Sequence, residues 1–386
     1  MKVPLLDLRP QLVDLRDEIV EAVTGVIDST QYIMGPEIEK LEKRIAKYCG
    51  SEDAVGVSSG TDALLISLMV LDVGPGDIVI TSNFSFFATA GVVARLNATP
   101  VFVDIDPATF NIDPKKLIKI LSEMDQERLK RVKAVIPVHL FGQCADMAEI
   151  LKIAKNFDIP VIEDCAQAIG AECKINGETR CAGSIGDFGC FSFFPSKNLG
   201  GIGDGGIVTV NKTNLAEILR LKRVHGAEKS YYHRIIGGNF RLDPIQATVI
   251  RIKLKHLNGW HQQRQKNACY YNKLFSESEI NEKIRTPKIM HPNTMQNPHI
   301  FNQYVIRTER RDELQSFLKA QGISSGVYYP IPFHLQECFR YLGGKKGDFP
   351  VSETAAKEVL ALPVYPGITT DMLERVVEKV KAFHLS

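Results

Sequence analysis

The sequence lacks a long apolar run and any cluster of one charge. Its 386 residues include 47 basic and 45 acidic side chains, a formal net charge of +2. The densest basic tract, RLKRVK at residues 128–133, is typical of a solvated helix end, so we expect no nucleic-acid partner. No segment approaches the roughly 20 apolar residues of a membrane span, and the start MKVPLLDLRPQ has no apolar signal region. We therefore expect a soluble cytoplasmic protein without a membrane partner.

Closely spaced cysteine pairs are also missing. The cysteines form no CxxC pair and have no histidine at metal-ligand spacing, so we expect no metal site. Such scattered cysteines are typical of free thiols in a reducing compartment. They lie at positions 49, 144, 165, 173, 181, 190, 269 and 338.

What the chain does have is enough length for more than one core. Apolar strands alternate with helices from about Ala54 to Val210, which predicts a mostly parallel α/β sheet with function at the carboxyl ends of its strands. After residue 258 the pattern changes to charged helices, a strand at Gln303–Arg307 and proline-rich turns. We predict a large domain over residues 1–250 and a smaller α/β domain over residues 251–386.

One lysine stands in an unusual setting. Lys197 follows the apolar segment Cys190–Phe194 and precedes a glycine-rich run, LGGIGDGG, that leads into the strand Gly206–Val210. Glycines allow a backbone to approach a ligand closely, so the amine could be held in a cleft. A solvated turn lysine is the alternative, because lysines are seldom buried.

Three further features lie where strands end. Asp164 follows the apolar strand Ile159–Ile162, and a buried carboxylate there needs a positive partner. The turn Ser58-Ser59-Gly60 precedes a helix from Thr61, whose first N–H groups can bind an anion or simply be capped. Phe84, Phe86 and Phe87 follow another strand, and could be either core residues or a flat contact for a ligand.

A lysine, a carboxylate, an anion-binding turn and an aromatic ring together fit pyridoxal phosphate. This cofactor needs a lysine that binds it as an imine, a carboxylate that keeps its ring nitrogen protonated, and donors for its phosphate.

The motifs also resemble one family along the whole chain, the sugar aminotransferases of the DegT/DnrJ/StrS type. The resemblance implies the aspartate aminotransferase fold (type I), an α/β fold with a large, mostly parallel sheet domain and a smaller C-terminal domain. It rests on VPLLDL, YIMGPEI, SSGTDALL, FATA, PVFVDID, PVHLFGQCADM, IEDCAQAIGA, FSFFPSKNLGGIGDGG, GGNFRLDPIQA, YYPIPFHLQ and LPVYPG.

The resemblance assigns roles to individual residues. It implies that Lys197 binds the cofactor and moves the substrate proton, and that Asp164 pairs with the pyridine nitrogen. It implies further cofactor contacts through Gly60, Thr61 and Ser192 at the phosphate, Phe86 against the ring, Gln167 at the ring hydroxyl, and Asn239 at the phosphate of a neighbouring subunit. Substrate contacts are implied for Tyr329, His334 and Arg241.

The implied activity is a ping-pong transfer of an amino group from L-glutamate to a nucleotide-linked keto sugar, with C3 as the expected position. Asn239 implies a homodimer with shared sites. Amination at C4, a cyclitol ketone as acceptor, and a silent pyridoxal-phosphate-binding regulator are the alternatives. A related sugar dehydratase has histidine at the lysine position, and Lys197 excludes that activity. Nucleotide and product, whether a surface-glycan or an antibiotic sugar, stay open.

Overall fold

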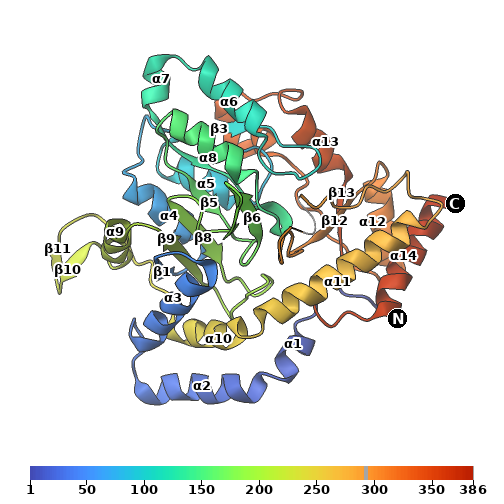
Figure 1. The fold of residues 1–386 in the computed structure, drawn as a ribbon, viewed down its shortest axis with the longest axis horizontal. Helices are drawn as coiled ribbons and strands as arrows, with labels where there is room; N and C mark the ends of the chain where they lie inside the picture. The colour runs from blue at the N-terminus through green and yellow to red at the C-terminus, as the bar shows by residue number, and fades with distance from the viewer. Residues whose placement is uncertain (291–293, 386) are drawn as a thin grey trace.

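A twisted sheet covered by helices on both faces dominates the computed structural model, which describes residues 1–290 and 294–385 (Figure 1). Its strands are, in spatial order, β1 (Asp53–Val57), β9 (Gly206–Val210), β8 (Phe188–Ser192), β5 (Ile162–Asp164), β4 (Val132–Ile136), β2 (Ile78–Ser82) and β3 (Thr99–Val103). Parallel bridges from Val135 to Val161 and from Val138 to Asp164 join the β5 and β4 halves. Within the described residues, β9 is the sheet strand that runs against the others.

Successive strand residues pack on opposite faces of this sheet, as its pleat requires. Val79 faces a cluster with α4 (Gly60–Val70), α5 (Ala88–Arg95) and α9 (Thr213–Arg223). Ile78 and Ile80 face α6 (Pro114–Glu123) and α8 (Met147–Asn156). Burial on both faces explains why the strands are almost continuously apolar.

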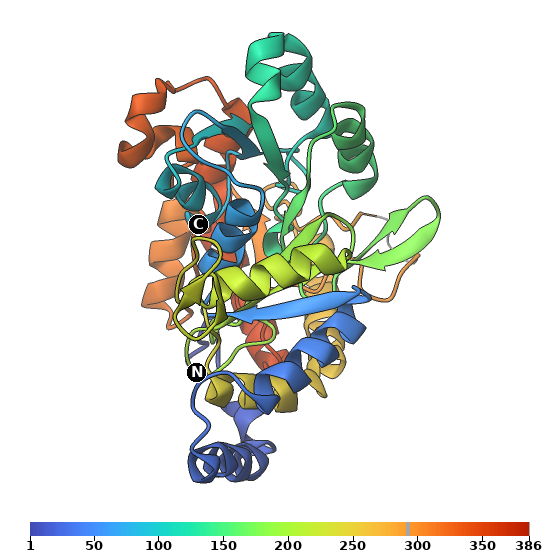
Figure 2. The ribbon, with the colours of Figure 1, turned by 90° about the vertical axis from the view of Figure 1, so that its left-hand side faces the viewer.

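Other helices cover the β1 half of the second face. They are α3 (Pro36–Cys49), α10 (Pro244–Leu254) and the first turns of α11 (Leu257–Ser276), and α2 (Arg16–Ser29) packs outside them on α10. The short helix α1 (Arg9–Val13) precedes α2, and the short helix α7 (Gln126–Lys130) lies beside β4. Figure 2 shows α9 lying over the β1 edge and the hairpin β6 (Glu172–Ile175)–β7 (Glu178–Cys181) projecting from the body. A second hairpin, β10 (Ala227–Lys229)–β11 (Tyr232–His233), projects beyond α9.

The C-terminal part has its own core. Strands β12 (Tyr304–Arg307) and β13 (Val359–Leu362) pair antiparallel, and α12 (Arg311–Ala320) and α14 (Thr370–Leu385) pack around them with the second half of α11. Helix α13 (Pro350–Glu358) and the 3₁₀ turns at Phe333–Leu335 and Glu337–Leu342 face the sheet domain. Val3 joins this core by bridging to Ile323. The division of the chain at residue 250 stays a proposal, supported by these separate cores.

The structure corrects several predicted element bounds. The apolar run Val132–Leu140 predicts one strand, but in the structure the strand ends at Ile136, because Pro137 has no N–H to continue the ladder and a 3₁₀ turn follows at Leu140–Gly142. The strand predicted at Ile159–Ile162 lies at Ile162–Asp164. The sequence from Pro244 to Leu257 predicts one long helix, but in the structure α10 ends at Leu254 and α11 begins at Leu257. Both hairpins were missed, since their half-exposed residues form no apolar run.

Candidate active site

A cavity of about 670 Å³ lies at the carboxyl ends of the sheet strands. Asp164 ends β5, Ser192 ends β8, and the segments after β1 and β2 supply further walls. The C-terminal part closes one side. The lining includes Ser59, Gly60, Thr61, Ser85, Phe86, Phe87, Asp164, Gln167, Ser192, Lys197, Asp204, Gln303, Tyr328, Tyr329, Ile331, Phe333 and Gln336.

Helix α4 directs its N-terminus at this cavity. The Ser59 hydroxyl caps the helix by accepting a hydrogen bond from the Asp62 N–H at 3.1 Å. The first N–H groups of a helix, here those of Gly60 and Thr61, have no intrahelical acceptor. Together with the helix dipole they favour an anion at this point. The predicted cap and the predicted anion site are therefore compatible.

Two glycines allow this helix end to lie against the sheet. A Cβ atom on Gly60 would lie 2.6 Å from Ser192 Cβ, and one on Gly206 would lie 2.4 Å from the Ser59 carbonyl oxygen. Neither distance is sterically possible without displacement of α4. The glycines thus bring the N–H groups of Gly60 and Thr61 next to Ser192, the three residues expected at a phosphate.

Asp164 is buried and held by two donors. The Thr89 hydroxyl donates to Oδ2 at 2.7 Å, and the Ala166 N–H donates to Oδ1 at 3.1 Å. Burial raises the pKa of the Asp164 carboxyl above its ordinary value, while these two hydrogen bonds and the charge of Lys197 act in the opposite direction. A cationic group in the cavity would complete the neutralisation of this carboxylate.

Lys197 reaches the same cavity from the turn after β8. Its side chain is half-buried, and desolvation of the amine lowers the pKa to about 8, against the opposing effect of the Asp164 charge. An amine with this pKa is neutral in about one molecule in ten at pH 7 and in half of the molecules at pH 8. It can therefore act as a nucleophile or a proton acceptor, which an ordinary surface lysine does poorly.

Aromatic side chains and an amide form the wall that faces the C-terminal part. Phe86 is 56% exposed despite lying on the cavity, and its ring centroid is 6.3 Å from that of Tyr329. The Gln167 amide donates to the Tyr329 hydroxyl at 3.0 Å and accepts from the Phe141 N–H at 2.7 Å. Gln167 is thus oriented by protein groups at both ends, whereas one face of Phe86 is available for a planar ligand.

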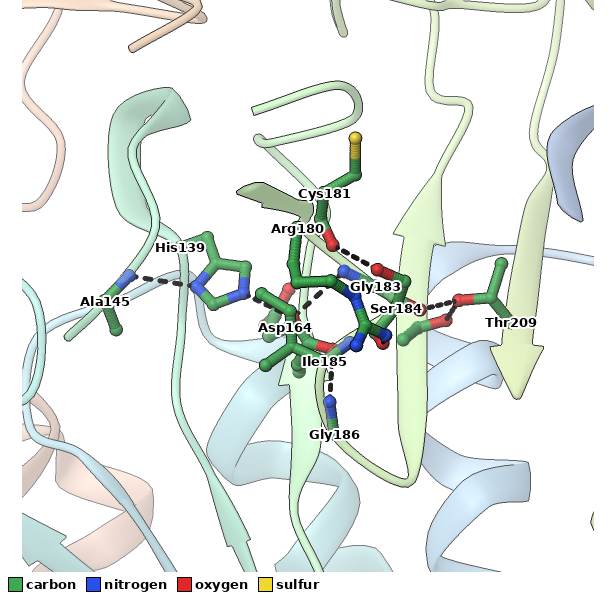
Figure 3. A network of polar contacts seen from close by, with 12 residues as sticks. His139, Ala145, Asp164, Arg180, Cys181, Gly183, Ser184, Ile185, Gly186 and Thr209 are labelled. Carbon is green, nitrogen blue, oxygen red and sulfur yellow. Dashed lines mark hydrogen bonds and ion pairs between the residues drawn. The ribbon is translucent and has the colours of Figure 1, made fainter. Parts of the chain in front are cut away.

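Glu163 lies on the opposite face of β5 from Asp164 and fixes the strand. Its fully buried carboxylate accepts from His139 Nε2 at 2.9 Å and from the N–H groups of Gly183, Ile185 and Gly186 at 2.7–2.9 Å. Figure 3 shows these donors gathered beside Asp164, and Arg180 donates to the Ser184 carbonyl in the same region. The network ties β5, which ends at Asp164, to the turn that precedes β8, and so sets the position of β5 relative to the strand that leads to Lys197.

The same network includes a group of metal-ligating residue types. Atoms of His139, Glu163 and Cys165 lie within 4.8 Å of one another. His139 Nδ1 accepts the Ala145 N–H, so Nε2 carries the proton that is donated to Glu163. Burial raises the pKa of the Cys165 thiol well above its ordinary value, which disfavours the thiolate that a metal needs. The hydrogen bonds of His139 and Glu163 explain why these side chains lie close together.

The cavity residues fit pyridoxal phosphate. An anion site lies beside Ser192, a buried carboxylate lacks a full counter-charge, an amine is partly neutral, and an aromatic ring has a free face. The sequence over residues 13–381 also matches the DegT/DnrJ/EryC1/StrS aminotransferase family. The chain belongs to this family. Its cofactor is pyridoxal phosphate, and its fold is the type I fold of pyridoxal-phosphate-dependent aminotransferases.

Relatives of this aminotransferase resemble it over nearly their full lengths. A protein of Geobacillus stearothermophilus named pleiotropic regulatory protein is 47% identical and aligns with 100% of this chain and 99% of its own. A UDP-2-acetamido-2-deoxy-3-oxo-D-glucuronate aminotransferase of Pseudomonas aeruginosa is 40% identical over 95% of this chain and 96% of its own. The crystal structure of S. venezuelae DesV with a ketimine intermediate superposes with a TM-score of 0.91 at 37% identity, covering 99% of this chain and 98% of its own.

Most residues expected at the aminotransferase site do lie on the cavity. They are Gly60, Thr61, Phe86, Asp164, Gln167, Ser192, Lys197 and Tyr329. The described residues that line the cavity do not include Asn239, Arg241 or His334. Asn239 is exposed, and its backbone pairs with Val224. His334 is 3% exposed and bonds to Asn83 and Glu353, so the expected substrate contact is blocked in this arrangement.

Sequence reasoning missed three residues that orient the site. Thr89 lies within FATA and Glu163 directly precedes Asp164, so both were within recognised motifs. Alternation along β5 was the available signal for Glu163, since neighbouring strand residues point to opposite faces. Asn83 had no such signal, because its partner His334 lies 251 positions away.

Proposed function

We propose that this aminotransferase moves an amino group from L-glutamate to C3 of a nucleotide-linked keto sugar. The observation that carries the proposal is the cavity that both Lys197 and the buried Asp164 line. The choice of C3 is supported by the relative named as an aminotransferase of a 3-oxo sugar nucleotide. Nucleotide and sugar stay open.

The residues that would hold the cofactor follow from the walls of the cavity. Gly60, Thr61 and Ser192 would bind the phosphate, and Asp164 would bind the protonated ring nitrogen. Phe86 would stack on the ring, and Gln167 would contact the ring hydroxyl. When bound, pyridoxal phosphate supplies an electron-accepting ring and a carbonyl carbon that takes up the amino group.

Lys197 would have two tasks. Its neutral Nζ would hold the cofactor, and the same amine would accept a proton from the amino donor and return it to a neighbouring atom. The low pKa of about 8 suits both tasks, because the amine must alternate between neutral and charged forms. Because burial raises the pKa of Asp164, a facing cation favours its ionised form, and the carboxylate in turn favours the protonated ring.

Substrate contacts and a second subunit complete the proposal. Tyr329 lies in the cavity wall and would contact the sugar. Exposed Asn239 would reach the phosphate site of a partner in a homodimer, and Arg241, next to it, would contact substrate there. His334 would need to leave its buried bonds to contact substrate, and a different role is argued below.

Free cysteines support our placing the enzyme in the reducing cytoplasm. No helix among the described residues has the length and apolarity to cross a bilayer.

The test is a two-step reaction followed by absorbance and mass spectrometry. We expect purified enzyme to show a visible cofactor band that borohydride removes, and L-glutamate to convert that band to the amine form. A panel of UDP- and dTDP-linked 3-keto and 4-keto sugars should then return the band, with mass spectrometry identifying the 3-amino product. Lys197→Ala should lower turnover by about 100- to 10,000-fold.

Each alternative function has a distinct outcome in this assay. Return of the band by 4-keto sugars or a cyclitol ketone, but not by 3-keto sugars, would replace the proposed acceptor. A band that L-glutamate and other amino donors leave unchanged would favour a cofactor-binding regulator. That outcome is relevant because one relative bears a regulatory name.

A further inference from the structure

A buried histidine connects the two parts of the chain at the rim of the cavity. His334 lies in the 3₁₀ turn Phe333–Leu335 and is 3% exposed. Asn83, directly after β2, is fully buried, and Glu353 in α13 is 8% exposed. We call these three residues the Asn83–His334 clamp.

Asn83 binds the turn at three points. Its carbonyl oxygen accepts the Phe333 N–H at 2.9 Å, and its side-chain Oδ1 accepts the His334 N–H at 3.1 Å. Its Nδ2 lies 2.8 Å from His334 Nδ1. Since an amide nitrogen can only donate, Nδ1 is the acceptor and the ring proton lies on Nε2. One asparagine thus fixes both the backbone and the ring of the turn.

The other side of the ring is bound as well. His334 Nε2 donates to Glu353 Oε1 at 3.1 Å, and the same oxygen accepts the Gly347 N–H at 2.7 Å. Burial alone would raise the pKa of Glu353, but the bonds from Gly347 and His334 outweigh it and leave that pKa below its ordinary value. The ring also lies 4.7 Å from the Phe349 ring. No ring nitrogen of His334 is left for a ligand.

The clamp lies between two walls of the cavity. Phe86 and Phe87 follow Asn83 on the sheet side, whereas Tyr329, Ile331 and Gln336 flank His334 on the other side. Asp164 ends β5 and Lys197 lies in the turn after β8, and neither is bonded to the clamp. The spacing of the two walls therefore depends on the clamp, whereas the positions of Lys197 and Asp164 do not.

We propose that His334 is a positioning residue which, through Asn83, holds the two walls at the separation that the amino-accepting sugar needs. This rests on the proposed function, because it deepens the account of how that site selects its acceptor. It predicts that breaking the clamp weakens binding of the large sugar nucleotide while leaving reaction with the small amino donor nearly intact.

The experiment compares His334→Ala, Asn83→Ala and the double variant in both half-reactions. We expect each single variant to raise KM for the keto sugar by about 10-fold and the double variant to be no worse, since both act through one contact. The glutamate half-reaction should change by less than about 2-fold. His256→Ala, an exposed histidine on the surface, is the matched control and should behave as the unaltered enzyme.

A second measurement does not depend on catalysis. Hydrogen exchange followed by mass spectrometry should show that peptides spanning residues 328–336 exchange faster in Asn83→Ala, which removes the Oδ1 acceptor of the His334 N–H, and in the isosteric Asn83→Asp, which removes the Nδ2 donor to His334 Nδ1. Asn83→Asp keeps the test valid if Asn83→Ala does not fold. If the unaltered enzyme aminated no sugar but exchange still rose, the proposed function would fail and the wall-holding contact would stand.

Three results would overturn the inference. If His334→Ala weakened sugar binding while Asn83→Ala did not, and their effects were additive, His334 would contact the sugar directly. An equal loss of activity in the glutamate and keto-sugar half-reactions would indicate a purely structural role for the clamp. Unchanged exchange in residues 328–336 would show that the clamp does not hold the turn.

Discussion

At the scale of single residues, Lys197 and Asp164 each depend on the other. Burial destabilises both charges, lowering the pKa of the amine to about 8 and raising that of the carboxyl, and each charge partly offsets the cost of the other. Neither group would have this reactivity in solvent. The sequence left open that Lys197 is a solvated turn lysine, and its position in the wall of the cavity argues against that alternative.

Attachment of pyridoxal phosphate to the cofactor-free enzyme should therefore depend on pH around 8. Below that value Lys197 is mostly protonated and cannot attack a carbonyl, so the attachment rate should rise with pH through about 8 and level off above it. Stopped-flow absorbance of cofactor binding measures this rate. A rate that continued to rise toward pH 10.5 would show an ordinary, solvated lysine.

Thr89 should control the ionisation of Asp164. Its hydrogen bond lowers the pKa of the carboxyl, so Thr89→Val should raise that pKa and move the acidic limb of the kcat/KM profile to higher pH. Thr89→Ser keeps the hydroxyl and serves as the matched control, with a profile close to that of the unaltered enzyme. A Thr89→Val profile that keeps its acidic limb would contradict this account.

At the scale of elements, the close approach of α4 to β8 and β9 builds the anion site. Gly60→Ala should weaken pyridoxal phosphate binding by about 10-fold or more, since its Cβ would lie 2.6 Å from Ser192 Cβ and push the helix away. Gly25→Ala, on exposed α2 with no atom within 4 Å of its Cβ, should bind the cofactor normally and gain about 0.5–1 kcal/mol in stability. Fluorescence titration and urea unfolding measure the two effects. Equal cofactor affinity in both variants would refute the steric argument.

The elements also show what a sequence can predict. The order of strands and helices followed from apolar runs and turn residues, and Gly206–Val210 was predicted with the right bounds. Its antiparallel direction was not predictable, because an apolar run looks the same in both directions. Positions at strand ends singled out Lys197, Asp164 and the phenylalanines after β2, whereas the family resemblance was needed for Gln167, Ser192, Asn239, Arg241, Tyr329 and His334. The Asn83–His334 clamp could not be predicted from the sequence, since no motif near Asn83 indicates a partner so distant in the chain.

At the scale of the whole molecule, the proposed sharing of sites can be tested by mixing inactive variants. Lys197→Ala and Asn239→Ala should each be inactive or nearly so as homodimers. A mixed dimer has one site with both residues intact if Asn239 acts across the interface, so random mixing should restore about a quarter of full activity. Co-expression with two tags, followed by assay, measures this. No recovery in isolated mixed dimers would place Asn239 in its own subunit's site or outside any site.

The proposal that the cavity is a sugar aminotransferase site is tested most directly by one spectroscopic titration. L-glutamate should convert the cofactor in the purified enzyme to its amine form, and a nucleotide-linked 3-keto sugar should then restore the original spectrum, releasing one 3-amino sugar for each site. A spectrum that glutamate leaves unchanged, or an amine form that no keto sugar can reverse, would contradict the account.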